Sequence, residues 1–112
     1  MLIKKSQTRL VENANECRVR EYNLGKKQLG IAKSRITGRY PTIGRVRNTE
    51  SDEIYLVISG EGDVHIDDKH YKIEKGDALY IEKESWFYVQ GTNLEIVAAT
   101  SPSWNEHQQE KS

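Results

Sequence analysis

Short hydrophobic runs alternate with polar or glycine-containing turns along the second half of the chain. Most of these runs are rich in β-branched or aromatic residues, which favour strands. None keeps apolar residues at helical spacing over the roughly 11 residues that a helix assignment requires. Repeated short strands joined by tight turns are typical of an antiparallel sandwich or barrel. The pattern predicts strands at residues 53–59, 64–66, 71–73, 78–81, 86–89 and 94–100.

Glycine and asparagine mark the predicted turns, because both residues tolerate a positive φ. Segment 60–62 reads Gly-Glu-Gly, and segment 91–93 reads Gly-Thr-Asn. We interpret both segments as turns that end one strand and begin the next. The polar segment 67–69 is interpreted as the tip of a hairpin.

The first half of the chain carries a weaker form of the same pattern. Residues 6–16 favour no single element. Pro41 stands at the entry of a short hydrophobic segment, where a missing N–H is tolerated in a strand. Here the sequence predicts strands at residues 17–24, 29–37 and 42–48.

The length of 112 residues fits one domain, and no internal repeat or linker divides it. We predict an all-β single domain over residues 1–112, with its core at about 17–100 and a polar tail at 101–112. Trp104 is the one hydrophobic anchor in that tail, so its last residues are expected to fray.

The composition limits where the protein works. No apolar run approaches the roughly 18 residues of a membrane span, so no membrane partner is expected. The start of the chain lacks the apolar segment of a secretory leader, and Cys17 is the single cysteine. We therefore expect a cytoplasmic protein in which Cys17 is a small buried hydrophobic residue.

The net charge of zero conceals a separation of charge along the chain. Residues 1–47 carry twelve Lys or Arg against three Asp or Glu, a net +9. Residues 48–112 carry five against fourteen, a net −9. No basic cluster is interleaved with stacking aromatics, so we expect no nucleic-acid partner. Instead, the two segments are expected to neutralise each other, within one chain or across a dimer.

Two blocks of the sequence resemble the cupin superfamily. The first is the segment 52–62, Asp-Glu-Ile-Tyr-Leu-Val-Ile-Ser-Gly-Glu-Gly, and the second is 75–81, Lys-Gly-Asp-Ala-Leu-Tyr-Ile, followed by Trp86 and Phe87. The resemblance covers residues 40–100 or so. It implies a small antiparallel jelly-roll β-barrel and, as in small cupins, a homodimer.

The resemblance fails at the metal ligands of the family. Its first motif reads His-x-His, then Glu after three or four residues, and Glu53 matches that Glu. The two histidine positions then hold either Val46 and Asn48 or Arg47 and Thr49, and the third histidine position holds Phe87. An open metal site needs several nitrogen or carboxylate ligands that converge on one point. We therefore expect no metal and no other cofactor.

The histidines that are present do not replace the missing ligands. His65 lies between Val64 and Ile66, so it points out of the barrel if those two point in. His70 flanks a polar turn and His107 lies in the tail. All three are interpreted as surface or interface residues.

Glu53 is the carboxylate of greatest interest. A carboxylate inside an apolar barrel needs a partner, and Arg45 and Arg47 are the nearest candidates along the sequence. Two arrangements remain open. Glu53 forms an internal bridge with one of these arginines, or it lies at the rim in water while the arginines stay on the surface.

Three functions fit these features. The first is a metal-independent cupin-like protein that binds a small molecule, a sugar or a carboxylate. The second is a cupin-type enzyme, an isomerase or a dioxygenase, that uses Glu53 with an atypical metal site or none. The third is an interaction module whose barrel is filled by its own side chains. The candidate ligand-binding residues are Arg45, Arg47, Asn48, Glu53, Tyr55 and Phe87.

Overall fold

The computed structural model describes residues 1–112, apart from the side chain of Ala14. It contains nine strands and two short 3-10 helices, and the described residues form no α-helix. The helices are η1 (Lys5–Gln7) and η2 (Glu106–Gln108). The strands are β1 (Arg9–Ala14), β2 (Cys17–Tyr22), β3 (Gly30–Tyr40), β4 (Val46–Asn48), β5 (Asp52–Ile66), β6 (Lys69–Glu74), β7 (Ala78–Ile81), β8 (Phe87–Ser101) and β9 (Gln109–Lys111).

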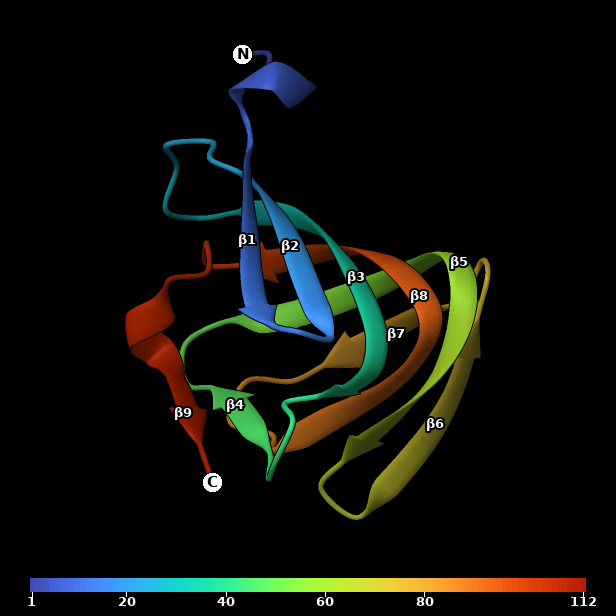
Figure 1. Cartoon of the computed structure of the whole chain (residues 1–112). Helices are drawn as coiled ribbons and strands as arrows, with labels where there is room; N and C mark the ends of the chain where they lie inside the picture. Colours follow the sequence, from blue (N-terminus) through green and yellow to red (C-terminus); the bar gives the residue numbers. More distant parts are fainter.

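The strands form one antiparallel sheet that curls around a single core (Figure 1). Its first layer has the order β1-β2-β3-β8-β5-β7, and its second layer is built from the other halves of β3, β8 and β5 together with β6. β4 joins the end of β8 and carries β9 on its other side. The prediction of an all-β, cupin-like jelly roll is confirmed.

The two predicted glycine turns are wrong, because β5 and β8 run through them without ending. β5 and β8 pair from Asp52↔Ser101 to Ile66↔Phe87, with register shifts around Ser59. Gly60 and Asn93 have positive φ at this level, 73° and 47°. A Cβ added to Gly60 would collide with the Asn93 backbone. Gly60 and Asn93 therefore lie in a β-bulge, which bends both strands from one layer into the other, and the rest of each tripeptide continues the strand pairing.

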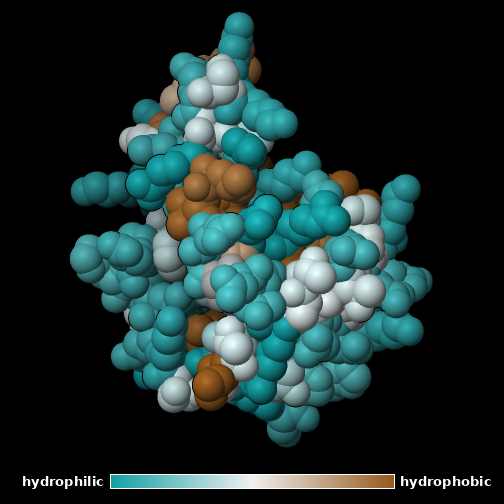
Figure 2. Space-filling model, viewed as in Figure 1, coloured by the Kyte–Doolittle hydropathy of each residue, from teal (hydrophilic) through white to brown (hydrophobic). Residues whose placement is uncertain are grey.

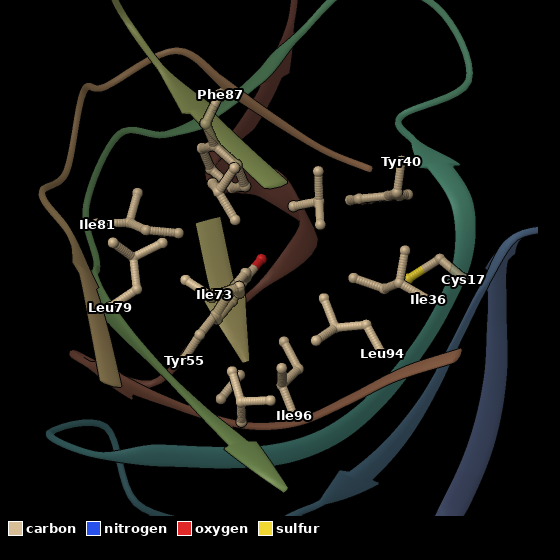
Figure 3. Packing of buried hydrophobic residues seen from close by; sticks show 14 of the residues in the cluster. Cys17, Ile36, Tyr40, Tyr55, Ile73, Leu79, Ile81, Phe87, Leu94 and Ile96 are labelled. Atoms are coloured by element: carbon tan, nitrogen blue, oxygen red, sulfur yellow. The ribbon is translucent and has the colours of Figure 1, made fainter. Parts of the chain in front are cut away.

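One hydrophobic cluster fills the curled sheet (Figure 3). Along β5 the side chains alternate, so Tyr55 and Val57 point inward and Ile54 and Leu56 point outward. Phe87 is the largest fully buried side chain, at 2% exposure. Complete burial of such a side chain stabilises the fold by about 1.5–3 kcal/mol.

The C-terminal segment is docked, so the expectation that it frays is wrong. β9 pairs with β4 from Val46↔Lys111 to Asn48↔Gln109. The buried Gln108 side chain accepts hydrogen bonds from the backbone N–H groups of Glu50 and Ser51 through Oε1. Its Nε2 donates a hydrogen bond to the Ser51 hydroxyl. Buried backbone N–H groups need a hydrogen-bond acceptor, and Gln108 supplies it for this segment. The sequence did not predict this docking, because the segment is polar and its contacts are hydrogen bonds to distant residues.

Several of the separated charges meet within the chain. Lys33 pairs with Glu95, and Arg47 pairs with both Glu84 and Glu110. Each of these pairs joins the basic first part to the acidic second part. Among the described residues, no helix is both long enough and apolar enough to cross a membrane.

Candidate functional site

A cavity of about 320 Å³ opens at one end of the curled sheet. Its walls come from the inner faces of β2, β3, β4, β5 and β8, and from the segment that precedes β9. The lining mixes aromatic and polar residues. It includes Cys17, Ser34, Tyr40, Asn48, Glu53, Tyr55, Phe87, Thr100, Trp104 and Gln109.

A chain of hydrogen bonds runs along one wall of the cavity. The Trp104 indole Nε1 donates to Asn48 Oδ1 at 2.9 Å, and Asn48 Nδ2 donates to Glu53 Oε1 at 3.4 Å. An indole N–H is a donor only, so the oxygen of the amide must face Trp104. The NH₂ group of Asn48 is thereby directed at the carboxylate.

Glu53 is buried deeply enough in the cavity wall for the pKa of its carboxyl group to shift. Burial raises the pKa of its carboxyl group from 4.5 to about 7, and the hydrogen bond from Asn48 opposes this shift only partly. Desolvation penalises the charged form, while a donor to the carboxylate favours it. At neutral pH both protonation states of Glu53 are therefore populated in a cavity that small molecules can enter.

Cys17 and Tyr55 are titratable groups that share the cavity with Glu53. Burial raises the pKa of the Cys17 thiol to about 12, and the charge of Glu53 adds to that shift. Burial, followed by the charges of Glu53, Tyr40 and Cys17, raises the pKa of Tyr55 well above 10. The hydroxyl of Tyr55 points toward the middle of the barrel (Figure 3). Cys17 and Tyr55 are thus neutral at physiological pH, and Cys17 is the small buried residue that the sequence suggested.

The structure brings four of the six candidate residues together. Asn48, Glu53, Tyr55 and Phe87 all line the cavity. Their part in ligand binding stays a prediction. The sequence missed Trp104 and Tyr40 as members of the same cavity, since nothing in a linear pattern shows that residue 104 returns to residue 48.

Arg45 and Arg47 lie outside the cavity, so of the two arrangements left open by the sequence, the internal bridge to Glu53 is not formed. Arg45 Nη1 donates to the backbone carbonyls of Asp67 at 2.8 Å and Trp86 at 3.4 Å. Arg47 Nε donates to Glu110 at 2.7 Å. The Arg47 guanidinium also lies over the Trp86 ring, 4.6 Å from its centre. Both arginines therefore lie on the outer side of β4, because alternate residues along a strand face opposite sides.

The alternation along β4 also decides between the two alignments of the cupin motif. Val46 and Asn48 are buried, whereas Arg47 points outward. Val46 lies directly opposite Phe87 across the β4–β8 pair. The positions that hold the family's metal ligands therefore converge in this chain, and they carry Val46, Asn48, Phe87 and Glu53.

These residues do not fit a metal ion. Val46 and Phe87 are hydrocarbons with 0% and 2% exposure, and one carboxylate with one amide leaves the ion underligated. Within the part of the chain that the structure describes, no group of three His, Cys, Asp or Glu side chains is placed to hold an ion.

The histidines lie where the alternation placed them. The His65 ring stacks between His70 and Tyr88, with both ring centres 4.4 Å away. The Arg39 guanidinium lies over the other face of Tyr88, 4.0 Å from its centre. His70 Nε2 lies 2.8 Å from Asp63 Oδ1. This stack is on the outside of the second layer, and His107 is exposed in η2.

Comparison with known proteins agrees with this architecture. A model of the cupin domain matches residues 40–101, more than half of the chain. The chain belongs to the cupin family. No curated protein shows significant sequence similarity to it.

Several solved structures show the same fold at low sequence identity. PAC13 from Streptomyces, in a variant solved with uridine, is 14% identical with a TM-score of 0.89, and the match covers 100% of this chain and 89% of that one. Pac13 is described as a nucleoside dehydratase. KdgF from Halomonas sp. is 12% identical with a TM-score of 0.76, over 96% of this cupin and 99% of KdgF. Oxalate decarboxylase OxdC from Bacillus subtilis is 17% identical with a TM-score of 0.77, over 97% of this cupin but 31% of OxdC.

Proposed function

We propose that this cupin binds a small, uncharged, polyhydroxylated molecule in its cavity without a metal ion. The observation that carries the proposal is the Trp104-Asn48-Glu53 chain on the cavity wall. Sugar-type ligands are recognised by fixed amide and carboxyl groups beside aromatic surfaces. The cavity volume of about 320 Å³ matches a ligand of monosaccharide to nucleoside size.

Charge favours a sugar over the carboxylate ligand that the sequence left open. The cavity lining, as far as the structure describes it, holds Glu21 and Glu53 but no Lys, Arg or His. An anionic ligand would meet two carboxyl groups and no cation, which is unfavourable in a partly desolvated site. Pac13, which shares the fold, has been solved with uridine, a molecule that carries an uncharged sugar.

Trp104 provides a probe for the test. The second tryptophan, Trp86, lies outside the cavity under Arg47. In a Trp86→Phe protein, the emission therefore reports on Trp104 alone. We expect uncharged monosaccharides or nucleosides to shift this emission with saturation. Uronic acids of the same size are expected to bind more weakly, and tighter binding of the acids would reject the proposal.

A second candidate function follows from the acidity of Glu53. A carboxyl group with a pKa of about 7 both donates and accepts protons at neutral pH, as a general acid–base catalyst requires. This favours the isomerase among the two enzyme classes considered, because the donor set present does not fit the metal that the dioxygenase needs. The test is solvent deuterium incorporation next to the carbonyl of a bound sugar, followed by NMR. Glu53→Gln is expected to abolish incorporation while ligand binding persists.

A further inference from the structure

Small side chains form one wall of the cavity and leave the space that the cavity occupies. They are neighbours across the β3–β8 pair, where Gly30 lies opposite Thr100 and Ala32 lies opposite Ala98. Larger side chains at these positions would fill the cavity. The wall consists of Gly30, Ala32 and Ser34 on β3 and of Ala98 and Thr100 on β8.

The Thr100 hydroxyl on this wall has no partner in the protein. The residue is 6% exposed and lines the cavity, and none of the hydrogen bonds among the described residues involves its Oγ1. Polar groups cover most of the molecular surface on the side shown in Figure 2, and there water satisfies them. A buried hydroxyl without a partner is unfavourable. The partner of Thr100 therefore comes from the contents of the cavity.

Gly30 leaves a notch beside this hydroxyl. A Cβ added to Gly30 would lie 2.7 Å from Thr100 Oγ1 and 3.3 Å from Ser103 Oγ. Ser103 also lines the cavity, and its backbone N–H donates to the Lys27 carbonyl at 2.8 Å, which fixes its position. Its hydroxyl, like that of Thr100, forms no hydrogen bond with a residue that the structure describes. Two hydroxyl groups therefore border the space that a side chain at residue 30 would take.

Glu53 adds a third polar group to this notch. It lies opposite Thr100 across the β5–β8 pair, and both residues line the cavity. The Cβ atoms of such a pair are about 5 Å apart. Asn48 donates to Glu53 Oε1, whereas Oε2 has no hydrogen-bond partner in the described chain. A carboxyl oxygen and two hydroxyls are thus available to the same bound group.

We infer that the Gly30 notch binds one hydroxyl group of the ligand and so determines which sugar derivatives the protein accepts. This inference rests on the proposed function and adds the part of the ligand that is recognised. A ligand hydroxyl both donates and accepts, so it can donate to Glu53 Oε2 while it accepts from Thr100 or Ser103. A hydrogen atom in its place leaves these polar groups unpaired. Sites built to pair with a hydroxyl reject analogues that lack it much more strongly than apolar pockets reject a change of size.

Isothermal titration calorimetry with matched ligands tests the inference. The probes are uridine and D-glucose, each compared with its monodeoxy derivatives. For the unmodified protein, we expect one derivative to bind at least about 10-fold more weakly than its parent, because the notch then lacks its partner. Thr100→Val is expected to reduce this ratio at least about threefold, because the hydroxyl is removed from the protein as well. Thr92→Val, on the exposed side of the same strand, is the matched control and should keep the ratio.

Gly30→Ala changes the notch from the opposite strand. Gly30 does not have a positive φ, so its backbone conformation accepts alanine. The added methyl group would displace the Thr100 hydroxyl, and we expect the preference for the parent ligand to disappear.

Thermal unfolding without ligand gives an independent readout. Thr100→Val is expected to keep or raise the Tm, because its hydroxyl makes no hydrogen bond within the protein that the change could remove. A Tm lowered by several degrees would show that the hydroxyl has a structural role and would overturn the inference.

The binding results separate this inference from the proposed function. If a parent ligand binds and Thr100→Val changes the ratio for none of its derivatives, the inference is wrong while the proposed function stands. If neither parent nor any derivative binds, the proposed function is rejected and the inference with it.

Discussion

The indole of Trp104 donates to the side-chain oxygen of Asn48 at 2.9 Å and so determines which end of that amide faces the cavity. Without this donor, the amide could present its oxygen to Glu53, and two acceptors would face each other. Trp104 is therefore a positioning residue for Glu53, which it does not contact. This relationship makes the acidity of Glu53 sensitive to a residue from another part of the chain.

Replacing the indole tests that relationship. Trp104→Phe removes the N–H donor while keeping an aromatic ring, and a lost hydrogen bond of this kind costs about 1 kcal/mol of unfolding free energy. We expect the pKa of Glu53 to rise further, since Asn48 no longer favours its charged form. Carbon-13 NMR titration of Glu53 measures the shift. Trp86→Phe is the control and is expected to leave the titration unchanged.

The stability of the protein should depend on pH through Glu53. Its pKa is about 7 when folded and 4.5 ordinarily, so the folded state binds more protons between these values. Stability from this group is therefore complete below pH 4.5 and is lost as the pH rises to 7, by about 3 kcal/mol at most. Urea unfolding at pH 5 and pH 8 measures this loss.

Glu53→Gln separates this effect from other titrations. The amide cannot ionise, so the variant should show a flatter pH dependence and greater stability than the unmodified protein at pH 8. Equal slopes for the two proteins between pH 5 and 7 would mean that Glu53 titrates normally.

The vacant metal positions can be refilled. Val46→His, Asn48→His and Phe87→His, combined with native Glu53, should create binding of Zn²⁺ or Mn²⁺, because these four positions converge. Calorimetric titration measures the affinity. The protein as it stands is expected to carry no stoichiometric Fe, Mn, Ni or Zn in elemental analysis.

The alternative alignment supplies the matched control. Arg47→His, Thr49→His and Phe87→His change as many residues, but Arg47 faces outward, so this variant should bind no more metal than Phe87→His alone. Phe87→His alone should lower the unfolding free energy by about 1–3 kcal/mol, because it buries an unpaired imidazole. Equal metal binding by both triple variants would contradict the observed register.

Gln108 is expected to hold the C-terminal segment in place. Gln108→Ala leaves the N–H groups of Glu50 and Ser51 without their acceptor and should cost about 2–3 kcal/mol of unfolding free energy. Hydrogen exchange in β4 and β9 should accelerate more than exchange in β5. Exposed Gln28→Ala serves as the control, and uniform acceleration through the chain would argue against a local anchor.

Salt should weaken any homodimer of this chain in which the basic segment 1–47 of one copy meets the acidic segment 48–112 of the other. Surface charges are screened over about 8 Å at physiological ionic strength, so the contacts between the basic and acidic segments are reduced as salt rises. We expect the dissociation constant, measured by sedimentation, to increase between low and high salt. A dimer whose dissociation constant does not move would indicate that the charges are neutralised within each chain, as Lys33 is by Glu95.

Local patterns predicted much of the fold and some of the cavity. Alternation between Val64 and Ile66 predicted that His65 points outward, and the cupin motif singled out Glu53, which lines the cavity. The prediction of turns at Gly60 and Asn93 was wrong, because residues with a positive φ occur both in turns and in bulges. Only the pairing of β5 with β8 along their whole length distinguishes the two.

The missing parts of the site are long-range. Arg47 was a candidate partner of Glu53 because it is near in sequence, yet in the structure it pairs with Glu110 on the outside of the strand. Trp104 was read as the anchor of a loose tail, although its partner Asn48 lies 56 residues earlier. No pattern within a window of ten residues contains either contact.

The separation of 56 residues between Trp104 and Asn48 also affects when their contact forms during folding. Contacts between distant segments form late in folding, because the entropy of closing a long loop must be overcome first. The hairpin of β5 and β6 joins neighbouring residues and can form early. The pairing of β4 with β9 requires two segments that are distant in the sequence to meet first. Burial in the folded barrel is what raises the pKa of Glu53, so the unfolded chain carries it as an ordinary carboxylic acid.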